Sequence, residues 1–139
     1  MIRKAHLHDL EAVVAVDKQV IGHDGRKIEI EKAIQQEKCF VALKGEKVVG
    51  FLLFHTHFFD CSFISLVMVS PHERRNGYAT ALIQQVEKIA STEKVFSSTN
   101  ESNETMHHVF ASNGYVRSGV VENLDEGDPE IVYFKRVSQ

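Results

Sequence analysis

The sequence predicts a mixed α/β fold, with one sheet of about seven strands and four helices lying on both of its faces. Three strand-like runs follow one another between residues 39 and 69 with only short turns between them, which is typical of an antiparallel meander. After residue 77, helical spacing alternates with strand-like runs, which favours a parallel crossover. With 139 residues, 43% of them hydrophobic, we expect one domain over residues 1–139.

The first half of the chain is expected to hold one strand, two helices and the meander. Residues 2–4 have strand character, and Asp9 then begins a helical pattern that Gly22 and Gly25 interrupt. The following stretches are, in order, a charged helix (26–37), a hairpin (39–43 and 48–56 around the turn 44–47), a connection (57–60) and a third antiparallel strand (61–69).

The second half alternates helices and strands. Helical spacing continues from Tyr78 to about Ser91, and the next strand, residues 95–99, should run parallel to residues 61–69 because a helix separates them. The remaining stretches are a helix (103–112) closed by Asn113-Gly114 and two final strands (115–124 and 131–136).

Composition excludes several classes of function. The net charge of −3 argues against nucleic acid or an anionic membrane as an obligate partner. The first ten residues lack the apolar core of a signal peptide, and no apolar run approaches the roughly 20 residues of a membrane span. We therefore expect a soluble, cytoplasmic protein in which Cys39 and Cys61 are reduced thiols rather than a disulfide.

The stretch from Ser65 to Thr80 has the features of an anion-binding turn. A strand ends at Pro71, a polar and basic turn follows, and Gly77 precedes a long helix. The first N–H groups of a helix have no internal partner and lie at the positive end of its dipole. Arg74 and Arg75 lie at the same end, which is unfavourable unless an anion is near. The stretch is neither a P-loop nor a three-glycine dinucleotide motif, and we interpret it as a phosphate cradle.

Two motifs in this sequence resemble those of the GNAT superfamily of acyl-CoA-dependent N-acyltransferases. Val69-x-Pro71-x-x-Arg74-x-x-Gly77-x-Ala79 is similar to the family's pyrophosphate-binding signature. Asn103-x-x-Met106-x-x-Val109-Phe110-x-x-x-Gly114-Tyr115 is similar to its fourth-helix pattern, with the same intervals. The opening Ile2 to Asp9 also resembles the family's first strand and helix, so the resemblance extends over essentially the whole chain.

This resemblance implies a GNAT-like fold, in which strand 61–69 splays from its parallel neighbour, and an acetyl-CoA-dependent N-acetyltransferase. Acetyl-CoA would be the cosubstrate, with no metal. Backbone groups in the splayed strand would pair with the pantetheine, and one N–H there would polarise the thioester carbonyl. The cofactor-binding residues that the resemblance implies are Val67, Met68, Val69, Arg74, Arg75, Asn76, Gly77, Tyr78, Ala79, Thr80, Asn103 and Phe110.

The positions where members of this family often carry acid and base residues are different here. The usual tyrosine falls at Phe110, and the glutamates of two subgroups fall at Ser98 and Phe63. His107 shares a helical face with Asn103 and Phe110 and is our candidate catalytic acid or base; the alternative is a solvent-exposed or core histidine. His55 and His57 could chelate a metal from one strand face, but no third ligand is placed near them, so we interpret them as structural.

The acceptor is suggested by an acidic loop before the last strand. Five acids lie within nine residues, and four of them, Glu122, Asp125, Glu126 and Asp128, are our candidate substrate-binding residues. Such a loop is either a solvated turn or a surface that concentrates a cationic amine. The leading function is therefore acetylation of the primary amine of a small, cationic acceptor. The alternatives are a catalytically weak acyl-CoA-binding sensor or regulatory module and a protein or peptide N-acetyltransferase. A homodimer through the last strands remains open.

Overall fold

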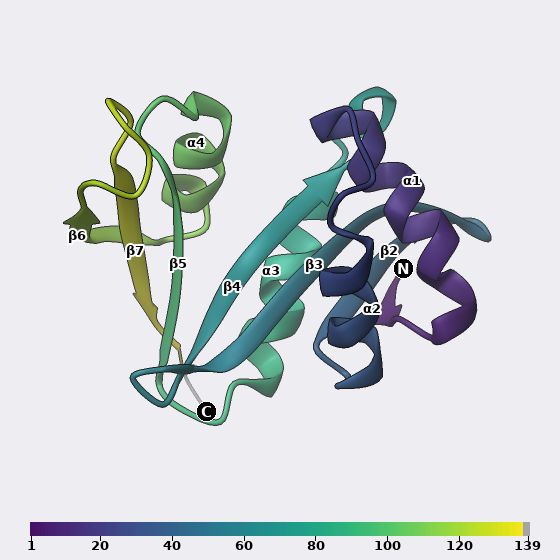
Figure 1. Cartoon of the computed structure of the whole chain (residues 1–139). Coiled ribbons are helices and arrows are strands. Elements are labelled where there is room, and N and C mark those ends of the chain that lie inside the picture. The colour runs from purple at the N-terminus through teal and green to yellow at the C-terminus, as the bar shows by residue number, and fades with distance from the viewer. Residues whose placement is uncertain (138–139) are drawn as a thin grey trace.

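One seven-stranded sheet organises the chain (Figure 1). The computed structural model describes residues 1–137. The strands are β1 (Ile2–Lys4), β2 (Cys39–Lys44), β3 (Lys47–Phe58), β4 (Cys61–Val69), β5 (Lys94–Asn100), β6 (Val116–Val121) and β7 (Glu130–Arg136), in the spatial order β1-β2-β3-β4-β5-β7-β6. The helices are α1 (Leu10–Ile21), α2 (Lys27–Gln35), α3 (Tyr78–Ile89) and α4 (Glu104–Ser112), with single 3-10 turns at Leu7–Asp9 and Pro71–Glu73.

The predicted fold class and strand directions are confirmed. Every pair of neighbouring strands is antiparallel except β4 and β5, which are parallel. Two predicted boundaries are wrong. β3 continues to Phe58, so the connection predicted over residues 57–60 is a two-residue turn, Phe59-Asp60, with both φ angles positive. β6 ends at Val121 rather than at residue 124, because the chain turns away into the acidic loop.

Each face of the sheet buries its own apolar cluster. On one face, α1 and α2 cover the half formed by β1 to β4, where Val13, Ile30 and Phe51 are fully buried. On the other face, Leu82 and Val86 of α3 pack with the inward residues of β2 to β5, and Phe110 of α4 extends the same cluster toward β7. The helices thus lie on both faces, as predicted.

A β-bulge at Ser65 changes the direction of the side chains along β4. Leu53 of β3 pairs with Leu66, whereas the next residue, Phe54, pairs with Ile64, so Ser65 has no partner of its own in the register. Its hydroxyl instead donates to the Leu53 carbonyl oxygen at 3.2 Å. Ile64 therefore packs in the α3 cluster while Leu66, only two residues later, packs against the α1 cluster. A bulge also increases the local twist, which turns the end of β4 away from the plane of the sheet.

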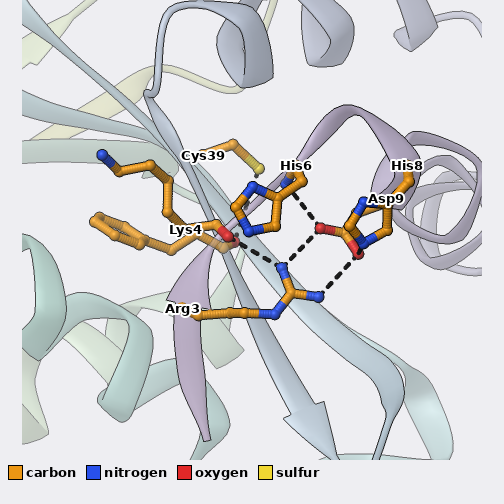
Figure 2. A network of polar contacts seen from close by, with 7 residues as sticks. Arg3, Lys4, His6, His8, Asp9 and Cys39 are labelled. Atoms are coloured by element: carbon orange, nitrogen blue, oxygen red, sulfur yellow. Dashed lines mark hydrogen bonds and ion pairs between the residues drawn. The ribbon is translucent and has the colours of Figure 1, made fainter.

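A network of polar contacts joins β1 to the start of α1 (Figure 2). The Arg3 guanidinium donates to both Asp9 carboxylate oxygens, at 2.8 and 3.0 Å, and the His6 backbone N–H donates to Asp9 Oδ2 at 2.7 Å. The bond from Arg3 lowers the pKa of Asp9 to about 2. The neighbouring Cys39 is a free thiol, and burial raises its pKa to about 12, so it is unreactive.

We expect Asp9 to stabilise the fold most strongly above about pH 4. Its pKa is about 2 in the folded protein against an ordinary 3.8, so its ionised form contributes roughly 2 kcal/mol that is lost as pH falls from about 4 to 2. Denaturant unfolding should give Asp9→Asn a deficit of about that size at pH 7, and the deficit should shrink toward zero near pH 2. A deficit that does not change with pH would contradict this account.

Candidate functional site

β4 and β5 form a fork that is closed at one end and open at the other. They pair over only three registers, from Ser62 with Val95 to Ile64 with Ser97, and then diverge (Figure 1). The buried Ser97 hydroxyl donates to the Ile64 carbonyl oxygen at 2.7 Å, at the last paired position. Beyond it, β4 still pairs with β3 as far as Val69. The backbone groups on the β5 side of Leu66 to Val69 are therefore left without a strand partner.

A cleft of about 300 Å³ lies in the open part of this fork. The splayed part of β4 forms one wall and β5 the other, and α4 contributes Asn103, Met106 and Phe110. Four predicted cofactor-binding residues thus line one cleft: Val67, Met68, Asn103 and Phe110. Asn103 is also the N-cap of α4, where its side chain accepts a hydrogen bond from the Met106 N–H at 3.2 Å.

The predicted phosphate cradle follows β4 and opens α3. Gly77 is the N-cap of α3 with φ 81° and ψ 9°, and Arg75 also has a positive φ of 66°. The Asn76 side chain donates to the Glu73 carbonyl oxygen at 3.0 Å, which closes the turn. Arg74 and Arg75 are exposed, and within residues 1–137 neither forms an ion pair. The turn therefore offers unpaired cations and helix N–H groups to an anion.

The space around the cradle and the fork fits a long molecule with an anionic end and amide groups. A Cβ added at Gly77 would meet nothing within 4 Å, so the backbone there is open to a ligand. The unpaired edge of β4 ends at Val69, shortly before this turn, and can bond to amides as a strand would. The other predicted cradle residues, Tyr78, Ala79 and Thr80, form the first turn of α3, and Thr80 Oγ1 accepts from Asn113 Nδ2 at 3.1 Å.

We predict that Gly77→Ala weakens binding of coenzyme A by roughly tenfold, because the added Cβ both strains a left-handed residue and occupies the cradle. Gly22 is a matched control, since its φ of 87° and ψ of 0° are nearly the same and it too has no atom within 4 Å of an added Cβ. Calorimetric titration and thermal melts should show similar losses of stability for the two variants, but a loss of affinity for Gly77→Ala alone. Equal affinities in the two variants would contradict the cradle.

Comparisons with known proteins agree with this geometry. Residues 7–115 match the model of the acetyltransferase (GNAT) family. The chain belongs to this family. The crystal structure of a GNAT-family acetyltransferase from Bacillus cereus ATCC 10987 is 46% identical, with a TM-score of 0.96 over 100% of this chain and 98% of that one. A search of curated proteins returned no match.

More distant structures share the GNAT fold. The ribosomal-protein-S18-alanine N-acetyltransferase from Escherichia coli has a TM-score of 0.84 at 17% identity, covering 100% of this chain and 94% of that one. The PaiA N-acetyltransferase from Thermoplasma acidophilum, solved with coenzyme A, has a TM-score of 0.79 at 16% identity, covering 98% of each chain. At these identities the likeness concerns the fold alone.

As a GNAT acetyltransferase, the protein uses acetyl-CoA as its cosubstrate, which supplies an acetyl group already activated as a thioester. The residues present fit it: the turn 74–80 would hold the pyrophosphate and the free edge of β4 the pantetheine. No group of three or more potential metal ligands occurs in residues 1–137. His55 and His57 instead stack on one another at 4.4 Å, and burial lowers the pKa of His55.

Two of the three positions where the family often has acid or base residues are apolar. Phe110 is fully buried and packs on the Tyr133 ring with centroids 4.8 Å apart. Phe63 stacks on the His55 ring and packs at a tilt against the Phe58 ring. Neither side chain can transfer a proton. The third position, Ser98, carries a hydroxyl that donates to Glu130 Oε2 at 2.7 Å.

His107 has hydrogen-bond partners at both ring nitrogens. Nε2 lies 3.1 Å from the Asn100 carbonyl oxygen and 2.9 Å from that of Glu101, and Nδ1 lies 2.5 Å from the Tyr133 hydroxyl. Carbonyl oxygens only accept, so the proton is on Nε2, and Nδ1 accepts from Tyr133. This arrangement fastens α4 to the end of β5. It gives His107 a structural role, and proton transfer by His107 stays a prediction.

We expect His107 and Tyr133 to be coupled in stability. His107→Ala should cost about 1–3 kcal/mol, because the buried Tyr133 hydroxyl loses its acceptor, and Tyr133→Phe in the same chain should recover part of that loss. Unfolding free energies of the two single variants and the double variant give the coupling, which should be about 1 kcal/mol. Additive losses would contradict the bond. Separately, unchanged turnover of His107→Ala from about pH 6 to 9 would end the acid–base hypothesis.

The acidic loop is fastened to the open end of β5. Asp125 Oδ2 accepts from Asn100 Nδ2 at 2.9 Å, and the two Asp128 carboxylate oxygens accept from the Ser102 backbone N–H and hydroxyl at 3.0 and 2.6 Å. Glu122 and Glu126 are exposed. Two of the predicted substrate-binding acids thus hold the loop in place beside the cleft, and the other two face solvent.

Sequence reasoning missed two charged residues that line the cleft, Arg26 and Glu130. Arg26 lies between α1 and α2, where its Nε donates to Oδ2 of the buried Asp17 at 3.0 Å. Glu130 opens β7 opposite Asn100. The sequence shows Glu130 only as the last of five acids in the loop region. Its place in the cleft depends on the register between β5 and β7, which are distant in sequence, so no local pattern predicts it.

Proposed function

We propose that this GNAT protein transfers the acetyl group of acetyl-CoA to the primary amine of a small, cationic acceptor, which attacks the thioester directly. The observation that supports a cationic acceptor is the charge of the cleft. Of the two charged residues that line it, Arg26 is paired with Asp17 through two nitrogens, whereas Glu130 has no basic partner among residues 1–137. The cleft therefore carries a net negative charge, which attracts an ammonium group.

The size of the cleft supports a small acceptor. A cleft of about 300 Å³ is at the lower end for ligand sites, and the pantetheine arm must share it. What remains suits a slender amine rather than a folded surface. Rate acceleration would come chiefly from holding the amine against the thioester, with a β4 backbone N–H stabilising the negative charge on the carbonyl oxygen.

The test is release of free thiol from acetyl-CoA in the presence of an acceptor panel. The panel contains polyamines, aminoglycoside-like amines, lysine-bearing peptides, neutral amines and amines that carry a carboxylate. Small cationic amines should give the highest kcat/KM. Peptides that outcompete small amines would replace this proposal with a protein or peptide acetyltransferase. Tight acetyl-CoA binding with no thiol release across the panel would replace it with an acyl-CoA sensor.

The loop acids supply a second prediction. Glu122→Gln with Glu126→Gln should raise KM for a cationic acceptor roughly threefold at low salt, and the effect should vanish in high salt because exposed charges are screened. Asp60→Asn with Glu93→Gln is the control: it makes the same change in net charge at exposed sites next to the first residues of β4 and β5, at the closed end of the fork. Equal KM values in both double variants would show that the loop acids do not contribute to acceptor binding.

A further inference from the structure

We propose that Glu130 is the general base of acetyl transfer and that Ser98 is its positioning residue, an inference that rests on the proposed function. Primary amines are protonated at neutral pH and cannot attack until a proton is removed. The site therefore needs a proton acceptor within reach of the acceptor amine. Neither Phe110 nor Phe63 can serve, and both ring nitrogens of His107 are already engaged.

Glu130 is the one carboxylate among the cleft-lining residues of the described chain. Glu130 is the first residue of β7 and pairs with Asn100, and its side chain extends to Ser98 of β5. The Ser98 hydroxyl donates to Oε2 at 2.7 Å, which fixes one oxygen. No hydrogen bond or ion pair within residues 1–137 involves Oε1, so the second oxygen is free to accept a proton.

Glu130 lies near the point where β4 and β5 diverge, on the side of the sheet where a base could reach the acceptor amine. The Ser97 hydroxyl bonds to the Ile64 carbonyl oxygen at the last paired position of the fork, and Ser98 is the next residue of β5. Because side chains alternate along a strand, Ser97 and Ser98 point to opposite faces of the sheet. Residues of α4 line the cleft from the Ser97 side. Ser98 therefore presents Glu130 on the face opposite α4, together with Arg26, so that an amine on that face has the β4 edge and the carboxylate on either side.

The proton balance is complete. Glu130 takes one proton from the ammonium group, the neutral nitrogen forms the C–N bond as the C–S bond breaks, and the nitrogen's second proton ends on the sulfur of the thiol product. The carboxylic acid then returns its proton to solvent. Products are the amide, the free thiol and one proton, with no oxidant or other reactant required.

Several other charged groups near Glu130 already have hydrogen-bond partners, and Glu101 and Glu122, which follow the residues paired with Glu130 on β5 and β6, are exposed to solvent. Arg26 on the α1–α2 connection pairs with Asp17, Asp125 and Asp128 accept from Asn100 and Ser102, and His107 contacts the Asn100 carbonyl oxygen. Across β7, the residue paired with Glu130 on β6 is Val121, which does not titrate. A change in the pH profile on altering Glu130 therefore reports Glu130 rather than a neighbour that it releases.

The experiment compares Glu130→Gln, which keeps an acceptor for the Ser98 hydroxyl, with wild type and with the control Asp60→Asn, an exposed turn residue next to the closed end of the fork. With an acceptor that is cationic at pH 7, Glu130→Gln should lower kcat by about 100-fold or more and shift the rising limb of the pH profile toward the pKa of the free amine. With an acceptor that is neutral at pH 7, the loss should be within about threefold. Affinity for acetyl-CoA should be unchanged in both variants.

Ser98 is tested alongside. Ser98→Ala should lower kcat several-fold with the cationic acceptor, and Ser98→Thr, which restores the hydroxyl, should recover it. Equal losses with cationic and neutral acceptors, or a wild-type pH profile in Glu130→Gln, would overturn the inference while leaving the acetyltransferase activity in place. A wild-type protein that binds acetyl-CoA but acetylates no amine would overturn both the inference and the proposed function.

Discussion

The hydrogen bond from Ser97 to the Ile64 carbonyl oxygen, together with the bulge at Ser65, determines where the sheet opens. Up to Ile64, β4 is hydrogen-bonded to β5. At Ser65 the bulge turns β4 away, and the edge of β4 that faces β5 is left free as far as Val69. The same turn directs Leu66 and Met68 into the α1 cluster, so apolar packing on that side holds the fork open. Without this packing, an unpaired strand edge inside a sheet would close on its neighbour.

The fork then separates the two tasks of the site. The free edge of β4 leads to the turn 74–80 at the start of α3, so backbone amides, helix N–H groups and two exposed arginines would together hold the cosubstrate. The carboxylate of Glu130 and the paired Arg26 lie on the face opposite α4. Acetyl donor and acceptor can therefore approach from different sides of the sheet and meet where the strands diverge.

Much of this could be predicted from the sequence, because the signals are local. Periodicity placed every helix and strand, and Pro71, Gly77 and the basic turn between them indicated the cradle. Features that depend on distant pairing were missed. Glu130 meets Ser98 across 32 residues, and Tyr133 meets His107 across 26, through registers that no local pattern encodes. The extension of β3 to Phe58 was missed because Phe59 and Asp60 form a tight turn with positive φ that lacks glycine.

Proton removal matters more at this site than proton donation, which explains how Phe110 can stand where a tyrosine is common in the family. An amine with a pKa near 10.4 is neutral in only about one molecule in 2,500 at pH 7, a cost of roughly 4–5 kcal/mol if no base acts. The departing thiolate has a conjugate acid with a pKa near 8.5, so the corresponding free-energy difference at pH 7 is only about 2 kcal/mol. A chain that keeps a carboxylate for the amine and gives up the acid for the sulfur therefore retains the larger of the two contributions. Phe110, freed from proton transfer, packs on Tyr133 and supports the wall of the cleft.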